Sequence, residues 1–271
     1  IYKMAPLNDH QSRNLFFGRV FGSKDACPTD IKEDSYKIIR KCGCLPLAIV
    51  SIASLLASES NIAREKWKHI QDSLSSTSEG MKDLVSLMYN SLPPRLRTCL
   101  LYLNMYQQGY VIKKDVLVKQ WVAEGFLNAV EGRDTEEIAE GYFDELVSKG
   151  MVQAVDTSTN GEVLSCTVHQ IVLDFIRHKS MEENFVITVD YFQSTVALPD
   201  KVRRLSVQFG GVKSAYIPES IVTSQVRSLL FWGFVECVPS ITDYGLLRVL
   251  ILHIWDDEDN ESFDLAGMGE L

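Results

Sequence analysis

The sequence predicts a multidomain, mainly α-helical protein in which a helical bundle is followed by a winged helix of mixed α and β structure, and then by the start of a leucine-rich-repeat solenoid. Three observations predict this order. Apolar residues recur at helical spacing from Thr29 to about Leu92. Three further helical segments and a hairpin with a period of two follow, up to Met181. Beyond them, a short apolar block that begins at Val202 recurs at intervals of 24 and 21 residues.

The first region reads as four short helices joined by short loops. Thr29 and Asp30 offer N-caps to the first helix. Pro46 stands where a helix tolerates proline, at its first position, and the helix that follows is apolar on all faces. A third helix is expected from Asn61, and a fourth over 81–92. Such a set forms a small bundle with the all-apolar helix at its centre.

A pair of prolines, Pro93 and Pro94, starts the second region. Helices are expected over 95–105, 113–124 and 135–149. The period then changes to two, and an Asn-Gly pair at 160–161 predicts a hairpin turn between two strands. A closing helix over 171–181 follows. Three helices followed by a β-hairpin are typical of a winged helix.

The third region contains three similar blocks, VRRL at 202–205, VRSL at 226–229 and LRVL at 247–250. Their spacing is that of leucine-rich repeats, which contribute one strand per repeat to a solenoid. A plain β-meander is the alternative that the sequence leaves open.

The composition is that of a packed globular protein. The 271 residues are 46% hydrophobic and carry a formal net charge of −9, which argues against a main task of binding nucleic acid or an anionic membrane. The most apolar stretch, Leu45 to Ala57, is too short to span a bilayer, and no signal peptide opens the chain. The six scattered cysteines match no zinc framework, so we expect free buried thiols in a reducing cytoplasm.

No complete catalytic site is evident in the sequence. The chain has no G-x-x-x-x-G-K-[ST] loop to surround a phosphate, and neither G-x-G-x-x-G nor G-x-S-x-G occurs. His169 is the most informative single residue because it stands where a strand ends and a helix begins. There it either donates to a phosphate at the helix N-terminus or satisfies a local carbonyl.

Four segments resemble the NB-ARC module of plant nucleotide-binding leucine-rich-repeat (NLR) resistance proteins. The CGCLPLA sequence at 42–48 is similar to the GLPLA motif, and 86–126 resembles the long signature around the start of the family's winged helix. The TVHQIVLDFI sequence at 167–176 resembles the MHD motif and its helix, and 12–22 is similar to the segment before the helical subdomain. The sequence is most similar to the coiled-coil class of this family.

The resemblance implies a domain order. Residues 1–27 would be the tail of the nucleotide-binding domain, 28–88 the helical ARC subdomain and 89–181 the winged-helix ARC subdomain. A linker over 182–200 and the first repeats over 201–271 would follow. The chain starts with Ile1 and stops inside the repeating pattern, so we expect a fragment whose phosphate loop and magnesium-binding strand precede it.

The resemblance also implies ADP or ATP as ligand and names four binding residues. Pro46 would pack against adenine between Leu45 and Leu47, and His169 would reach the β-phosphate of ADP. The chain departs from the family at two positions. Cys44 replaces the leading Gly of the GLPLA motif, and Gln170 replaces the Asp of the MHD motif. The loss of that carboxylate predicts weaker retention of ADP.

The expected function is a non-enzymatic ATP/ADP switch in a cytoplasmic immune receptor. Its repeats would recognise a pathogen effector or a guarded host protein, and the intact protein would self-associate on activation. One rival is a winged-helix DNA-binding regulator that uses Lys113, Lys114 and Lys119, but residues 90–180 hold nine Lys or Arg against twelve Asp or Glu, a net charge of −3. The other rival is an inactive remnant that serves only as an interaction module.

Overall fold

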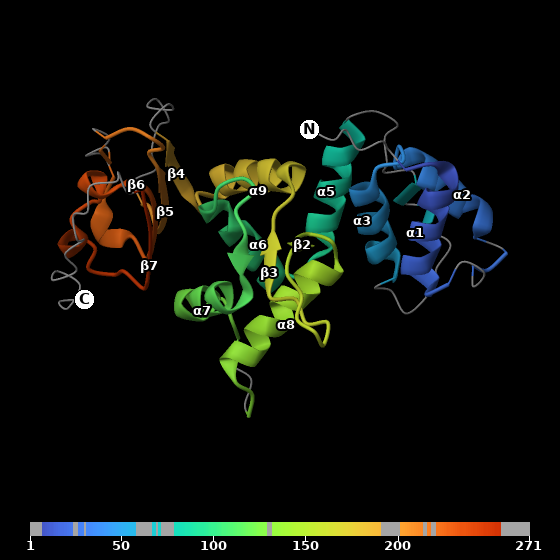
Figure 1. Cartoon of the computed structure of the whole chain (residues 1–271), viewed down its shortest axis with the longest axis horizontal. Helices are drawn as coiled ribbons and strands as arrows, with labels where there is room; N and C mark the ends of the chain where they lie inside the picture. The colour runs from blue at the N-terminus through green and yellow to red at the C-terminus, as the bar shows by residue number, and fades with distance from the viewer. Residues whose placement is uncertain are drawn as a thin grey trace. The chain divides into compact units, whose positions relative to one another are not determined.

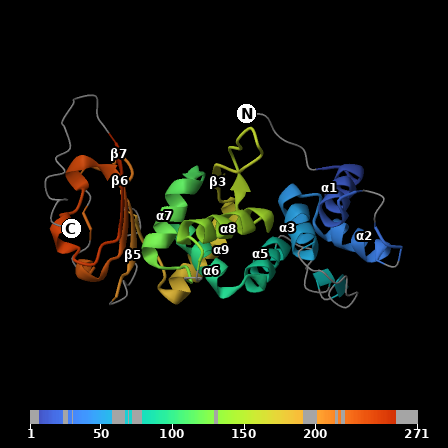
Figure 2. The same ribbon diagram turned by 90° about the horizontal axis from the view of Figure 1, so that it is seen from below.

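Figures 1 and 2 show the computed structural model of the chain as a ribbon. The chain divides into two compact units, which are described one at a time below. The first unit comprises Ile1–Arg97, Val111–Lys114 and Gly141–Phe175, and the second comprises Thr98–Tyr110, Asp115–Glu140 and Ile176–Leu271. The residues that the structure describes are 7–23, 27–29, 31–57, 67–68, 70–71, 79–128, 132–190, 201–213, 216–217 and 221–255.

The first unit begins with a helical bundle. Its helices are α1 (Asp9–Phe21), α2 (Lys32–Lys41), α3 (Pro46–Ala57) and α5 (Glu79–Ser91). A capping box starts α1, because the Asn8 side chain accepts from the amide of Gln11 while the Gln11 side chain accepts from the amide of Asn8. The N-cap of α2 is Ile31, which makes no side-chain hydrogen bond, so the prediction that Thr29 caps this helix is wrong. Asp30 lies outside the described residues.

Helix α3 is the centre of the bundle, as its apolar sequence predicts. It starts at Pro46, the predicted first position, and packs against α1 and α5. Its fully buried residues include Ile49, Ile52 and Ala53. On α1, the ring of Phe16 is edge-on to that of Trp67, at 6.1 Å between centroids. Most of the helix predicted from Asn61 lies outside the described residues.

Four helices of the predicted winged helix follow in the expected order. They are α6 (Pro94–Tyr102), α7 (Lys114–Glu124), α8 (Thr135–Ser148) and α9 (Gln170–Glu183), and a short 3₁₀ turn, η1 (Leu103–Met105), continues α6. The wing in the first unit is a three-stranded antiparallel sheet with the order β1-β3-β2. Its strands are β1 (Ile112–Lys113), β2 (Gln153–Ala154) and β3 (Ser165–Thr167). The hairpin was predicted, whereas β1 was not.

The second unit contains a four-stranded parallel sheet with the order β4-β5-β6-β7. The strands are β4 (Ile187–Asp190), β5 (Arg204–Gln208), β6 (Ser228–Phe234) and β7 (Val249–Trp255). Leu205, Leu229 and Leu250 occupy the same register position, so each predicted block forms one strand. The pairing is parallel throughout, which rules out the β-meander, whose strands are antiparallel. Strand β4 lies inside the segment predicted as a linker.

Short 3₁₀ turns link the repeated strands and cover one face of this sheet. They are η2 (Thr223–Gln225), η3 (Val235–Cys237) and η4 (Ile241–Asp243). The core under them is built from alternate residues of the strands, among them Leu205, Val207 and Phe231.

In the part of the chain that the structure describes, no helix is long and apolar enough to cross a membrane.

Candidate functional site

The segment that resembles GLPLA forms a tight turn into α3. Gly43 and Cys44 both have positive φ, 60° and 59°. The amide of Leu45 donates to the carbonyl of Cys42 at 3.1 Å, and the carbonyl of Leu45 accepts the first helical hydrogen bond, from Ile49. Leu45 is 42% exposed. Pro46 is also exposed, and Leu47 is half-buried. The turn therefore places apolar side chains on the surface at the start of α3.

The φ of Cys44 explains why a glycine suits this position. A left-handed backbone conformation costs an L-residue about 1–2 kcal/mol, and glycine avoids this cost. Cys44 retains the conformation, and the turn is held by a further hydrogen bond, from the amide of Leu7 to the carbonyl of Cys44 at 3.1 Å. Cys44 therefore adopts, at a cost in conformational energy, a backbone conformation that glycine would adopt freely.

His169 is the residue that starts α9. Its carbonyl accepts from the amide of Leu173 at 2.9 Å, and its ring Nδ1 accepts from the amide of Ile171 at 3.3 Å. A backbone amide can only donate, so Nδ1 is unprotonated and the proton of the neutral ring lies on Nε2. The side chain is half-buried. The ring of His169 thus accepts from a local amide, rather than donating to a local carbonyl, and keeps an N–H donor on its other nitrogen.

The N-terminus of α9 carries no acidic side chain in its first turn. Gln170 occupies the first helical position and is exposed. The positive end of the helix dipole is therefore not neutralised by a carboxylate from its own first turn.

Contacts within the first unit join α3 to the chain just before the wing. Arg19 of α1 donates from Nε to Ser54 Oγ on α3 at 3.2 Å, and from Nη2 to the carbonyl of Ser148 at 2.8 Å. Gly150 approaches Ser51 so closely that a Cβ atom there would lie 3.4 Å from Ser51 Oγ. The turn at 45–47 and His169 both belong to the first unit. Among the described residues of this unit, no hydrogen bond joins 45–47 to His169. Sequence reasoning missed Arg19, because 129 positions separate it from Ser148.

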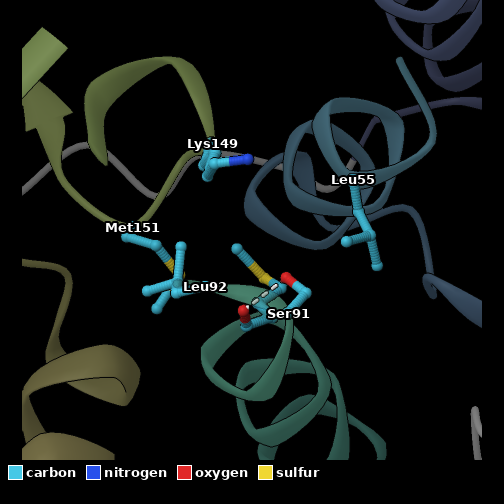
Figure 3. Close-up of a pocket in the computed structure, with 6 residues that line it drawn as sticks. Leu55, Ser91, Leu92, Lys149 and Met151 are labelled. Atoms are coloured by element: carbon cyan, nitrogen blue, oxygen red, sulfur yellow. Dashed lines mark hydrogen bonds between the residues drawn. The ribbon is translucent and has the colours of Figure 1, made fainter. Parts of the chain in front are cut away.

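A small pocket lies at this joint (Figure 3). Leu55 of α3, Ser91 at the end of α5 and Met151 after α8 are among its lining residues. Its volume of about 10 Å³ has room for at most one water molecule. Ligand pockets are typically larger than about 300 Å³, so this pocket is a packing gap rather than a nucleotide site. None of the four predicted binding residues lines it.

Lys114 is a poor candidate for contact with DNA. Its side chain is 8% exposed, and its ammonium lies 3.2 Å from both Asp144 and Glu162. The ammonium also lies over the ring of Phe143, at 5.6 Å. This lysine therefore holds the wing hairpin and α8 together and presents no free cation to a phosphate backbone.

Comparison with known proteins agrees with this architecture. Residues 105–176 match the winged-helix domain of disease resistance proteins. Disease resistance protein RGA5 of Oryza sativa subsp. japonica is 46% identical over 262 residues, which are 94% of this chain. Disease resistance protein Pik-2 of the same species is 36% identical over 264 residues, or 92% of this chain. The chain belongs to the family of plant disease resistance proteins.

A relative from another plant extends the similarity. The putative late blight resistance protein homolog R1B-16 of Solanum demissum is 30% identical over 243 residues, which are 89% of this chain. The matched regions amount to 23% of RGA5, 25% of Pik-2 and 19% of R1B-16. The chain thus spans about a quarter or less of the length of these resistance proteins, and the family confirms the winged helix of the predicted fold.

Proposed function

We propose that the chain is part of an intracellular plant immune receptor that uses ADP and ATP as a switch in defence against pathogens. Its membership of the disease resistance family supports a role in defence. The observation that carries the nucleotide proposal is His169, which starts α9 and keeps its Nε2–H as a donor while Nδ1 is engaged. A donor at the N-terminus of a helix suits a phosphate.

The proposed site has an apolar part and an anionic part. Pro46 would pack on the adenine, flanked by Leu45 and Leu47, and the exposure of this turn leaves it available to a ligand. His169 would donate from Nε2 to the β-phosphate of ADP. The phosphate loop and the magnesium ligands would come from residues outside this chain.

The switch follows from differential affinity. A nucleotide that contacts both α3 and α9 stabilises the arrangement in which the two helices face it together. ADP would hold this closed arrangement, and its exchange for ATP would shift the population towards an open one. The role proposed here is regulatory and needs no catalytic residue in this chain.

The parallel sheet supports the proposal that leucine-rich repeats begin in the second unit. One strand per block, aligned in register, is the construction of a solenoid. Further repeats would then present a surface to a pathogen effector or to a guarded host protein, and activation would lead to self-association of the intact receptor in the cytoplasm.

Release of a fluorescent ADP analogue from the full-length protein tests the proposal. His169→Asn keeps an N-cap side chain but loses the Nε2 donor. Loss of one hydrogen bond to a charged group predicts release that is about 10- to 100-fold faster. His178→Ala, which alters an exposed histidine on the same helix, is the matched control. Equal release rates for the parent protein and His169→Asn would reject the assignment.

Gln170→Asp tests the departure from the family motif. A carboxylate at the first position of α9 would stabilise the helical turn that presents His169. We expect slower release of ADP than from the parent protein. An unchanged release rate would show that the amide at 170 does not weaken the switch.

A further inference from the structure

A buried ion pair joins α7 to the first repeated strand within the second unit. Glu124 ends α7 and its side chain has no exposed surface, while Arg204 opens β5 and is 11% exposed. The guanidinium donates to Glu124 Oε2 from Nε at 3.0 Å and from Nη2 at 2.7 Å. Its remaining nitrogen, Nη1, donates to the carbonyl of Phe185 at 3.4 Å. The arginine is thus satisfied at all three nitrogens.

The neighbouring strand and two aromatic rings complete this site. Ser228 of β6 donates from Oγ to Glu124 Oε1, and the hydroxyl of Tyr102 donates to Ser228 Oγ at 3.3 Å. The guanidinium carbon lies 4.2 Å from the ring centre of Phe185 and 4.9 Å from that of Phe126. Both carboxylate oxygens of Glu124 therefore accept hydrogen bonds, and the guanidinium of Arg204 lies against two aromatic rings.

Such a pair contributes selectivity more than stability. Replacement of a buried ion pair by two apolar side chains of similar size is often neutral for folding, because desolvation of both charges offsets their attraction. Removal of one partner alone is costly, since the other charge stays buried without compensation. The pair therefore penalises any arrangement in which Glu124 does not meet a cation.

The repeat itself provides competing arrangements. Arg204, Ser228 and Val249 occupy the same register position on β5, β6 and β7. A sheet displaced by one strand would bring Ser228 to the place of Arg204, and a displacement by two strands would bring Val249 there. The next position along each strand is leucine in all three, so apolar burial discriminates poorly between these arrangements.

We infer that Arg204 selects which repeated strand docks on α7, and that Glu124 is its buried receptor. A displaced sheet buries the carboxylate of Glu124 against a serine or a valine, neither of which carries a compensating charge. The role is independent of the nucleotide switch proposed above, because it concerns how the second unit itself is assembled. It also gives a reason for a buried charge in a strand position that is uncharged in the two following blocks.

The experiment removes the arginine from the first repeated strand. In Arg204→Ser, neither the observed docking nor one displaced by a strand brings a cation from this register position to Glu124. Ser206 Oγ donates to the carbonyl of Met105 at 2.8 Å, so residues 105 and 206 are neighbours in the observed docking. Leu230 takes the position of Ser206 on β6. A disulfide between cysteines introduced at 105 and 206 reports the observed docking, and one between 105 and 230 reports a displacement by one strand.

The expected result is a loss of the crosslinking preference. In the parent chain the 105–206 disulfide should exceed the 105–230 disulfide by about a hundredfold or more, as expected when a mispaired buried charge is avoided. In Arg204→Ser the ratio should fall below about tenfold, because the arginine no longer favours one docking over the other. The native Cys99 and Cys237 are buried, which limits their side reactions. A ratio that stays near a hundredfold in a folded Arg204→Ser chain would overturn the inference.

Two further variants keep the inference falsifiable if Arg204→Ser does not fold. In Glu124→Leu with Arg204→Met, both charges are gone, so the chain should fold but its crosslinking preference should fall below about tenfold. A preference that stays near a hundredfold would contradict the role of the pair. Arg203→Ser removes the adjacent, exposed arginine and should leave the ratio as in the parent chain. A loss of preference in this control would equally overturn the inference.

Discussion

Gly150 lies at the joint between α3 and the chain after α8, and its replacement by alanine offers a quantitative test of this packing. Gly150 is buried and has a φ of +71°, in the left-handed region. An alanine there costs about 1–2 kcal/mol in backbone conformation. Its Cβ would lie 3.4 Å from Ser51 Oγ and 3.6 Å from Ser51 Cα, which are ordinary van der Waals contacts, so the cost is that of the backbone conformation. Alanine also lowers the conformational entropy of the unfolded chain, which offsets about 0.4–1 kcal/mol of that cost.

The net effect of Gly150→Ala is a decrease of about 1 kcal/mol in the free energy of unfolding, which urea unfolding followed by circular dichroism would measure. Gly141→Ala is the matched control. This glycine lies within α8, has no positive φ, and an added Cβ would meet nothing within 4 Å. Alanine there should stabilise the helix by about 0.5–1 kcal/mol. If both substitutions changed the free energy of unfolding in the same direction, the reasoning would be refuted, because the structure assigns opposite effects to the same chemical change.

Two other outcomes follow from the structure. Cys44→Gly should raise the free energy of unfolding by about 0.5–1 kcal/mol, since it relieves a φ of 59°, and thermal unfolding of the two chains measures this gain. Burial lowers the pKa of His253, whose ring stacks on Trp232 at 3.8 Å. The unfolded chain therefore binds the proton more tightly, so the contribution of His253 to stability is complete above about pH 6.5 and decreases as the pH falls below that value. As the pH falls below about 6.5, the free energy of unfolding of His253→Phe should rise relative to that of the parent chain. A difference that does not change with pH would contradict this.

The parts of the fold with strong periodic patterns could be predicted from the sequence. Helix α3 begins at the expected proline, and α8 covers all but the last residue of the predicted span. The two strands that were missed had no such pattern: β1 has two residues, and β4 has four within a segment that lacks a repeat block. The repeat interval predicted one strand per block, but only the structure shows that the strands are parallel.

The functional residues divide in a similar way. The roles of Leu45, Pro46 and Leu47 rest on a resemblance, since an exposed apolar turn has no local signature of a ligand. His169 could be placed at a strand-to-helix junction, but the state of its Nδ1 depends on a hydrogen bond that the sequence does not specify. The pairing of Glu124 with Arg204 joins residues 80 positions apart, and no local pattern predicts such a contact.

The division between the two units has a consequence for how the protein unfolds. Four of its five boundaries lie within helices: α6 is divided after Arg97, α7 after Lys114, α8 before Gly141 and α9 after Phe175. A helix propagates order along its axis, because each turn is hydrogen-bonded to the next. Melting of either unit would therefore fray helices that the other unit also needs. The two units should lose structure in one cooperative transition, and a cut within any of these helices would damage both.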